Sequence, residues 1–88
     1  MKKQIILYTT RKCAKCKSLK NWLKRNNLSF VEKDLADIEV MADLVMRNIV
    51  ALSAPVLEAV NRFFLSDQIF GKNNSLQPSF IKVMEKRK

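Results

Sequence analysis

The 88-residue sequence has no histidine, one glycine and two prolines. Without histidine it lacks the side chain that most often serves as a general base or metal ligand near neutral pH. Because Gly71, Pro55 and Pro78 are the only glycine and prolines, most of the chain should be regular secondary structure. No segment approaches the ~18 consecutive apolar residues of a membrane-spanning helix. The basic start is followed by an apolar run (residues 5–7) too short for a signal peptide. We therefore expect a cytoplasmic protein with no membrane segment.

Acidic residues are also scarce: eight against 17 basic ones, for a net charge of +9. The basic residues do not form one tract but are spread over expected helix faces and the C-terminus. The aromatic residues lie within apolar patterns instead of an exposed stacking array. We therefore interpret the charge as a solvated basic surface that favours acidic partners, and not as a nucleic-acid interface.

The length and the 48% of hydrophobic residues predict one domain spanning residues 1–88. Apolar periodicity predicts strands at 4–8 and 28–34, followed by a hairpin of strands 56–60 and 63–65 with its turn at 61–62. Helices are predicted at 14–25, at 38–47 and from Pro78 onward, with a loop at 67–75. The first strand is apolar without a break, which is typical of a central strand. The first helix has Cys16, Leu19, Trp22 and Leu23 on its core face and Lys17 and Lys20 outside, and residues 26–27 end it. Asp34 or Asp37 caps the second helix, and Asn48 ends it. The second helix places Ile38, Met41, Leu44 and Val45 on one face. The expected order is β-α-β-α-β-β-α, an α/β fold.

Both cysteines, Cys13 and Cys16, lie in the segment between the first strand and the first helix. A Cys-x-x-Cys pair at such a junction is typical of a thiol–disulfide redox site. Cys13 is expected at the helix N-terminus, where unpaired N–H groups and the helix dipole favour a thiolate. Lys12 and Lys15 add positive charge nearby, and such settings lower cysteine pKa values to roughly 3.5–7.5. We predict that Cys13 attacks a substrate disulfide, that Cys16 resolves the mixed disulfide, and that a Cys13–Cys16 disulfide results.

Two other interpretations of the pair stay open. The cysteines are small core residues in one of them and metal ligands in the other. A structural zinc site normally takes four nitrogen or sulfur ligands, so this chain alone supplies half of one, and we assign it no metal and no cofactor. An iron–sulfur cluster shared between two protomers would supply four thiolates.

The Cys-x-x-Cys motif, the order of elements and the segment Ser53-Ala54-Pro55-Val56 together resemble the glutaredoxin-like branch of the thioredoxin-fold proteins. That resemblance implies a four-stranded mixed sheet with helices on both faces. It also implies a cis Ala54–Pro55 bond facing the cysteines, with the backbone of Ala54 pairing with a substrate segment. By the same resemblance, Thr9 and Thr10 lie on the rim of the site, and Tyr8 before them lies either on the rim or in the core.

The sequence departs from glutathione-using glutaredoxins at three places. Thr10 stands where they carry a basic residue, although Arg11 and Lys12 follow it; Ala54 precedes the proline; and no Gly-Gly-Asp-like segment follows the fourth strand. The Ser-Ala-Pro segment is closer to redoxins that are reduced by a thioredoxin-reductase-type enzyme and that serve ribonucleotide reductase. The resemblance thus implies a dithiol oxidoreductase acting on protein or small-molecule disulfides, with such an enzyme or glutathione as electron donor. We expect a monomer, because no helix shows an apolar seam of the kind that a dimer would bury. The alternative is a binding module that bridges an iron–sulfur cluster or docks an acidic partner.

Overall fold

The computed structural model describes residues 4–49, 54–59, 62–72 and 75–86. Its elements are β1 (Ile6–Thr9), α1 (Ala14–Arg25), β2 (Val31–Asp34), α2 (Ile38–Met46), β3 (Val56–Ala59), β4 (Arg62–Phe64), α3 (Ser66–Ile69) and α4 (Pro78–Lys86). In this described part, no helix is long and apolar enough to cross a membrane.

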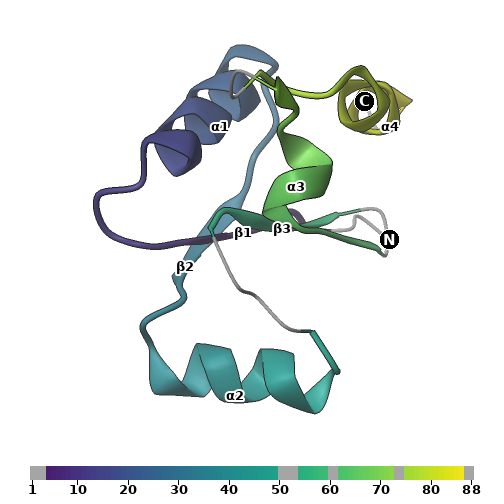
Figure 1. The fold of residues 1–88 in the computed structure, drawn as a ribbon. Coiled ribbons are helices and arrows are strands. Elements are labelled where there is room, and N and C mark those ends of the chain that lie inside the picture. Colours follow the sequence, from purple (N-terminus) through teal and green to yellow (C-terminus); the bar gives the residue numbers. More distant parts are fainter. Residues whose placement is uncertain (1–3, 50–53, 60–61, 73–74, 87–88) are drawn as a thin grey trace.

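The four strands form one mixed sheet in the order β2-β1-β3-β4. Strand β1 runs parallel to β2 and antiparallel to β3, and β3 and β4 form an antiparallel pair. Helices α1, α3 and α4 lie on one face of the sheet and α2 lies on the other (Figure 1). The structure confirms the predicted α/β fold, with its four-stranded mixed sheet and helices on both faces.

Strand β1 is central, and its side chains contribute to two cores. Leu7 packs with α1, α3 and α4, whereas Tyr8 belongs to a smaller cluster under α2. Alternate residues of a strand point to opposite faces, which explains why this strand is apolar without a break. The core stripe of α1 is as the periodicity predicts: Cys16, Leu19 and Leu23 are buried and Trp22 packs against them.

Helices α1 and α2 end in the same way. Asn27 and Asn48 follow their C-caps with positive φ angles of 57° and 62°, a conformation that asparagine tolerates. The next residue in each case, Leu28 or Ile49, donates its N–H back to a carbonyl in the last turn of the helix, at 3.0 and 2.9 Å. These bonds satisfy carbonyls that the helix itself leaves unpaired. At the start of α2, Asp37 is the N-cap and accepts the N–H of Glu39 at 2.9 Å. The sequence predicted the two asparagine ends, and of its two candidates for the N-cap of α2, Asp34 and Asp37, the structure has Asp37.

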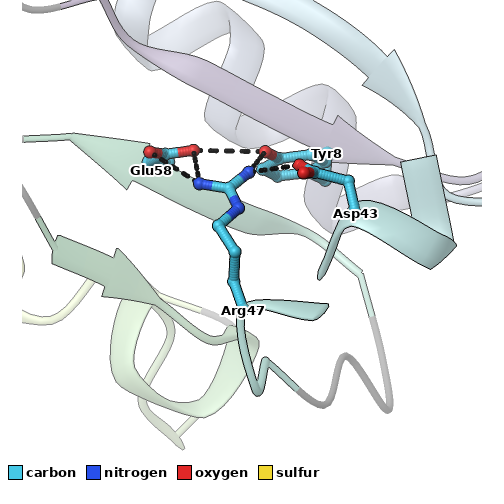
Figure 2. A network of polar contacts seen from close by, with 4 residues as sticks. All are labelled: Tyr8, Asp43, Arg47 and Glu58. Atoms are coloured by element: carbon cyan, nitrogen blue, oxygen red, sulfur yellow. Dashed lines mark hydrogen bonds and ion pairs between the residues drawn. The ribbon is translucent and has the colours of Figure 1, made fainter. Parts of the chain in front are cut away.

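Helix α2 is held to the sheet by one polar network, centred on Arg47 (Figure 2). Its guanidinium donates to Asp43 at 2.5 Å, to Glu58 on β3 at 3.2 Å and to the hydroxyl of Tyr8 on β1 at 3.3 Å. It also lies 5.1 Å from the ring centroid of Phe63. Asp43 is the main cause of the raised pKa of Arg47, so the guanidinium stays charged. The network therefore ties the end of α2 to both central strands.

The expected apolar face of α2 is only partly buried. Leu44 is fully buried and Met41 half-buried, but Ile38 and Val45 are 84% and 64% exposed. Seven of the nine residues of this helix are either large and apolar or alanine, and they are distributed around several sides of it, so periodicity alone does not determine which face is buried. The choice made in the fold leaves an apolar stripe facing solvent.

Several boundaries also differ from the predictions. Strand β2 begins at Val31 and is exposed along its length, because it is the edge strand. Arg62, predicted in the hairpin turn, opens β4. The segment after β4, predicted as a loop from 67, contains the short helix α3, in which Leu65 N–H bonds the Gln68 side chain at 2.8 Å. Residues 60 and 61 of the predicted hairpin lie outside the described residues.

Candidate functional site

The two cysteines lie at the junction between β1 and α1, and they form a disulfide. Cys13 is the N-cap of α1, and its Sγ accepts the N–H of Cys16 at 3.1 Å. Cys16 is only 2% exposed, whereas Cys13 is half-buried. Cys13 is thus accessible to a second molecule, whereas Cys16 is covered.

The backbone reaches this position through an uncommon turn. Lys12, immediately before Cys13, has a φ of 55°. Positive φ is uncommon for a residue with a side chain, since Cβ crowds the backbone there. The turn at Arg11 and Lys12 lets the extended Cys13 begin the helix. The sequence did not indicate this backbone conformation, because lysine carries no preference for it.

An open hollow of about 660 Å³ borders the disulfide. It is lined by Thr9, Thr10, Arg11, Lys12, Cys13, Cys16, Lys17, Lys20, Glu32 and Asp34. The structure therefore brings the predicted residues Thr10, Arg11 and Lys12 together beside the cysteines. All three are exposed.

Thr9, predicted on the rim, is also in the lining, and four lining residues were missed in the sequence: Lys17, Lys20, Glu32 and Asp34. Two come from β2, which runs parallel to β1 and pairs Thr9 with Asp34. Because the carboxyl ends of parallel strands meet at one edge of a sheet, Asp34 at the end of the predicted second strand was the available signal. Lys17 and Lys20 were visible only as outward-facing residues of α1.

A hydrogen-bonded group of three side chains joins α1 to strands β1 and β2 at the wall of the hollow. The Thr9 hydroxyl donates to Glu32 at 2.8 Å, and the ammonium of Lys20 forms an ion pair with the same carboxylate at 3.2 Å. The bond from Thr9 is the main reason that the pKa of Glu32 lies below its ordinary value, and Lys20 lowers it further. Glu32 therefore remains a carboxylate and neutralises Lys20. Within the described ranges, Arg11, Lys12 and Lys17 form no ion pair, and these three cations outnumber the unpaired carboxylate of Asp34 in the lining, so the open rim is cationic.

The other three predicted residues lie outside the lining of this hollow. Lys15 is half-buried, with its ammonium 5.7 Å from the ring centroid of Phe70. The Ala54–Pro55 bond is cis, as the sequence predicted, and Pro55 is fully buried. Since Tyr8 pairs with Val56, continuing the β1–β3 register by one residue sets Pro55 opposite Thr9. Pro55 is thus at the same end of the sheet as the cysteines.

The described residues 4–49, 54–59, 62–72 and 75–86 contain no group of three or more histidine, cysteine, aspartate or glutamate residues that could hold a metal ion. The arrangement that they do contain is one accessible sulfur, one covered sulfur and a cationic rim. Chemically, such a pair is suited to exchange a disulfide with a second molecule.

Comparisons with known proteins agree with this geometry. In solved structures, the fold is similar to that of the thioredoxin-like protein BC3987, with a TM-score of 0.65, 19% identity and coverage of 97% of this chain and 100% of that chain. A mutant of BC3987 gives a TM-score of 0.67 at 17% identity, covering 93% of this chain and 99% of that chain. At these identities the likeness establishes the thioredoxin-like fold.

Among curated proteins, the chain is 36% identical over 39 residues to the "Global transcriptional regulator Spx 2" of Bacillus anthracis and to that of Bacillus cereus. The match takes in 44% of this chain and 30% of each regulator, so the chain spans about a third of the length of these relatives. The glutaredoxin family model matches residues 5–63, which include β1, the Cys13–Cys16 pair and β3. With two thirds of its length matched, this chain belongs to the glutaredoxin family.

Proposed function

We propose that the protein is a dithiol–disulfide oxidoreductase in which Cys13 is the nucleophile and Cys16 the resolving thiol. The observation that carries the proposal is the unequal exposure of the two disulfide-bonded cysteines at the N-terminus of α1. A substrate reaches Cys13 from the hollow, whereas Cys16 reacts only with Cys13.

The reaction has two exchange steps. In the reduced protein, the thiolate of Cys13 attacks one sulfur of a substrate disulfide, forms a mixed disulfide and releases the other substrate sulfur as a thiolate. Cys16, after losing its proton to solvent, attacks the Cys13 sulfur and releases the second substrate thiolate. The pair loses two electrons, the substrate gains them, and the Cys13–Cys16 disulfide of the present structure is the oxidised product. A thioredoxin-reductase-type enzyme or glutathione then returns two electrons.

The helix start favours the first step. The Cys16 N–H already points at the Cys13 sulfur, at 3.1 Å, and the α1 dipole places partial positive charge there. The unpaired cations of the rim, Arg11 and Lys12 among them, add to the field. Negative charge on a reduced Cys13 would be stabilised by each of these groups.

The pocket residues suggest roles for the remaining predicted positions. Thr10, Arg11 and Lys12 form the rim that a substrate meets, and the backbone at Ala54, beside the buried Pro55, is our proposed shelf for an extended substrate segment. Lys15 contributes its charge from the side of Phe70 instead of from the hollow. Protein disulfides, including one in ribonucleotide reductase, are our proposed substrates.

Trapping the mixed disulfide tests this assignment. Reduced Cys16→Ser protein, mixed with oxidised glutathione or a disulfide-linked peptide, should accumulate a covalent adduct on Cys13, visible by intact-mass spectrometry. Reduced Cys13→Ser protein should form none, and wild-type protein should pass to the internal disulfide. An adduct on Cys16 in the Cys13→Ser protein at a similar rate, or a wild-type protein that forms no internal disulfide, would refute the roles.

A second candidate is suggested by the match to the Spx 2 regulators: a redox sensor in which the disulfide alters binding to a partner. The distinction is catalytic turnover. An oxidoreductase reduces many equivalents of substrate when a reductase or glutathione is supplied, whereas a sensor changes state once.

A further inference from the structure

The outer face of α2 carries apolar side chains that the fold leaves in solvent. Ile38 is 84% exposed, Val45 64% and Met46 84%. Ile38, the exposed Ala42 and Val45 recur at spacings of four and three residues, so they form one stripe along the helix, with Met46 beside its end. In Figure 1, this helix stands apart from the other three, on its own side of the sheet. An exposed apolar patch of this kind on a charged protein marks an interaction site.

The charge around this stripe is opposite to that of the rest of the molecule. The stretch 34–46 contains four of the eight acidic residues of the chain and none of its 17 basic residues. Arg47, the first basic residue after it, directs its guanidinium inward onto Asp43, Tyr8 and Glu58 (Figure 2). Among the described residues, Asp37 and Glu39 at the start of α2 form no ion pair, whereas Asp34 belongs to the lining of the Cys13 hollow. The surface at α2 is therefore apolar with an uncompensated acidic border.

We propose that the outer face of α2 binds an amphipathic helix of a partner protein whose apolar stripe is flanked by lysine and arginine. A helix fits because the stripe is one helix wide and straight, and ridges of this spacing pack against a second helix at 8–10 Å. Basic flanks fit because Glu39 and its acidic neighbours border the stripe. The site lies across the sheet from α1 and α4, and it is separate from the Cys13 hollow.

The same charges argue against three other occupants. A second copy docked through its own α2 would bring the same carboxylates to the interface. An anionic bilayer and a nucleic acid are both negatively charged and are repelled by the carboxylates at residues 37–43. Each of these occupants is an outcome that the following experiment detects.

Two synthetic peptides of about 18 residues serve as probes, long enough to form five turns. Both carry the same leucine stripe; one has lysine and arginine flanks and the other has glutamate flanks. We expect the basic peptide to bind and to shift the backbone amide resonances of residues 38–46 in isotope-labelled protein. The acidic peptide should bind at least about tenfold more weakly, a difference of ~1.4 kcal/mol. Added salt should weaken the binding of the basic peptide, because it screens the attraction between opposite charges.

Variants locate the site. The double variant Ile38→Ser, Val45→Ser should bind the basic peptide at least about tenfold more weakly, because these exposed apolar side chains make the proposed contact and contribute little to the stability of the fold. Glu39→Lys should weaken it severalfold. Glu85→Lys is the matched control, because it makes the same charge change at an exposed site of α4, on the other side of the sheet. Thermal melts followed by circular dichroism confirm that each variant is folded.

The proposal is overturned if both peptides bind equally, if the amide shifts centre on α1, or if Glu85→Lys has the effect of Glu39→Lys. It is equally overturned if sedimentation equilibrium shows a dimer that Ile38→Ser disrupts, or if vesicles of anionic lipid or a DNA duplex bind at α2. Disulfide trapping on Cys13 is measured on the same variants. Since it does not involve α2, failure of the docking proposal and failure of the redox assignment are distinguishable.

Discussion

The orientation of α2 predicts that truncating two adjacent residues, Leu44 and Val45, changes the free energy of unfolding by very different amounts. Leu44 is fully buried among residues of the cluster under this helix, whereas Val45 is 64% exposed. Truncating a buried leucine to alanine removes its transfer free energy and leaves a cavity, at a cost of ~2–5 kcal/mol. We therefore expect Leu44→Ala to lower the free energy of unfolding by at least about 2 kcal/mol.

Val45→Ala should behave differently although it changes the next residue of the same helix. An exposed side chain has little burial to lose, and alanine is a better helix former than valine by up to ~0.7 kcal/mol. The two terms nearly cancel, so the net change should lie within about 0.5 kcal/mol of zero. For a chain of this size, a loss of 2 kcal/mol lowers the melting temperature by roughly 8 °C or more.

Urea unfolding followed by the fluorescence of the single tryptophan, Trp22, measures both variants against wild type. The midpoint should fall in Leu44→Ala with an unchanged slope, since a change in midpoint alone reports stability. If Val45→Ala loses as much as Leu44→Ala, or if Leu44→Ala loses less than about 1 kcal/mol, α2 docks through another face and the reasoning is refuted.

Three further predictions concern the ionisable and aromatic groups. Burial and the nearby Glu58 raise the pKa of Tyr8 above its usual value, so its contribution to stability is present below that value and is lost as pH rises through the folded-state pKa. The tyrosinate absorbance of this single tyrosine should appear at lower pH in Glu58→Gln and at higher pH in Arg47→Met; identical midpoints would contradict the network. The pKa of Glu32 is lowered in the folded protein, so its contribution to stability is present above the unfolded-state pKa and is lost as pH falls through the folded-state pKa. On acidification, the urea midpoint of Glu32→Gln should therefore fall less than that of wild type. If the two midpoints fall in parallel with pH, Glu32 does not have this role. Phe80 is 1% exposed, and its ring lies edge-to-face with that of Phe64 at 5.2 Å between centroids. Phe80→Ala should therefore lower the free energy of unfolding by ~3–5 kcal/mol. An unchanged calorimetric melt would refute its place in the core.

The candidate site was predicted in part from the sequence. Cys13 and Cys16 were found because their spacing and their place between a strand and a helix are local properties. The hollow was not, because Glu32 lies 16 residues after Cys16 and meets it only through the parallel pairing of β1 and β2. Lys20 was predicted merely as an outward-facing helix residue, and only the position of Glu32 explains where its ammonium lies.

The sequence by itself determined the features that depend on a few neighbouring residues. The start of α1 at a Cys-x-x-Cys motif, the asparagines that end α1 and α2, and the Asp37 cap are set by backbone preferences and short-range hydrogen bonds. The apolar run of β1 likewise indicated a central strand, because only a strand covered on both sides hides such a run from water.

Only the tertiary structure decided which side of α2 faces the sheet. Its residues are apolar over most of the helix circumference, so burying Leu44 and exposing Ile38 was one of several arrangements that the pattern permits. In this arrangement the Arg47 guanidinium reaches Glu58, 11 residues later on β3, and Tyr8, 39 residues earlier on β1. Such long-range contacts exist only once the sheet has formed, and they determine both the buried core under α2 and the apolar stripe left outside.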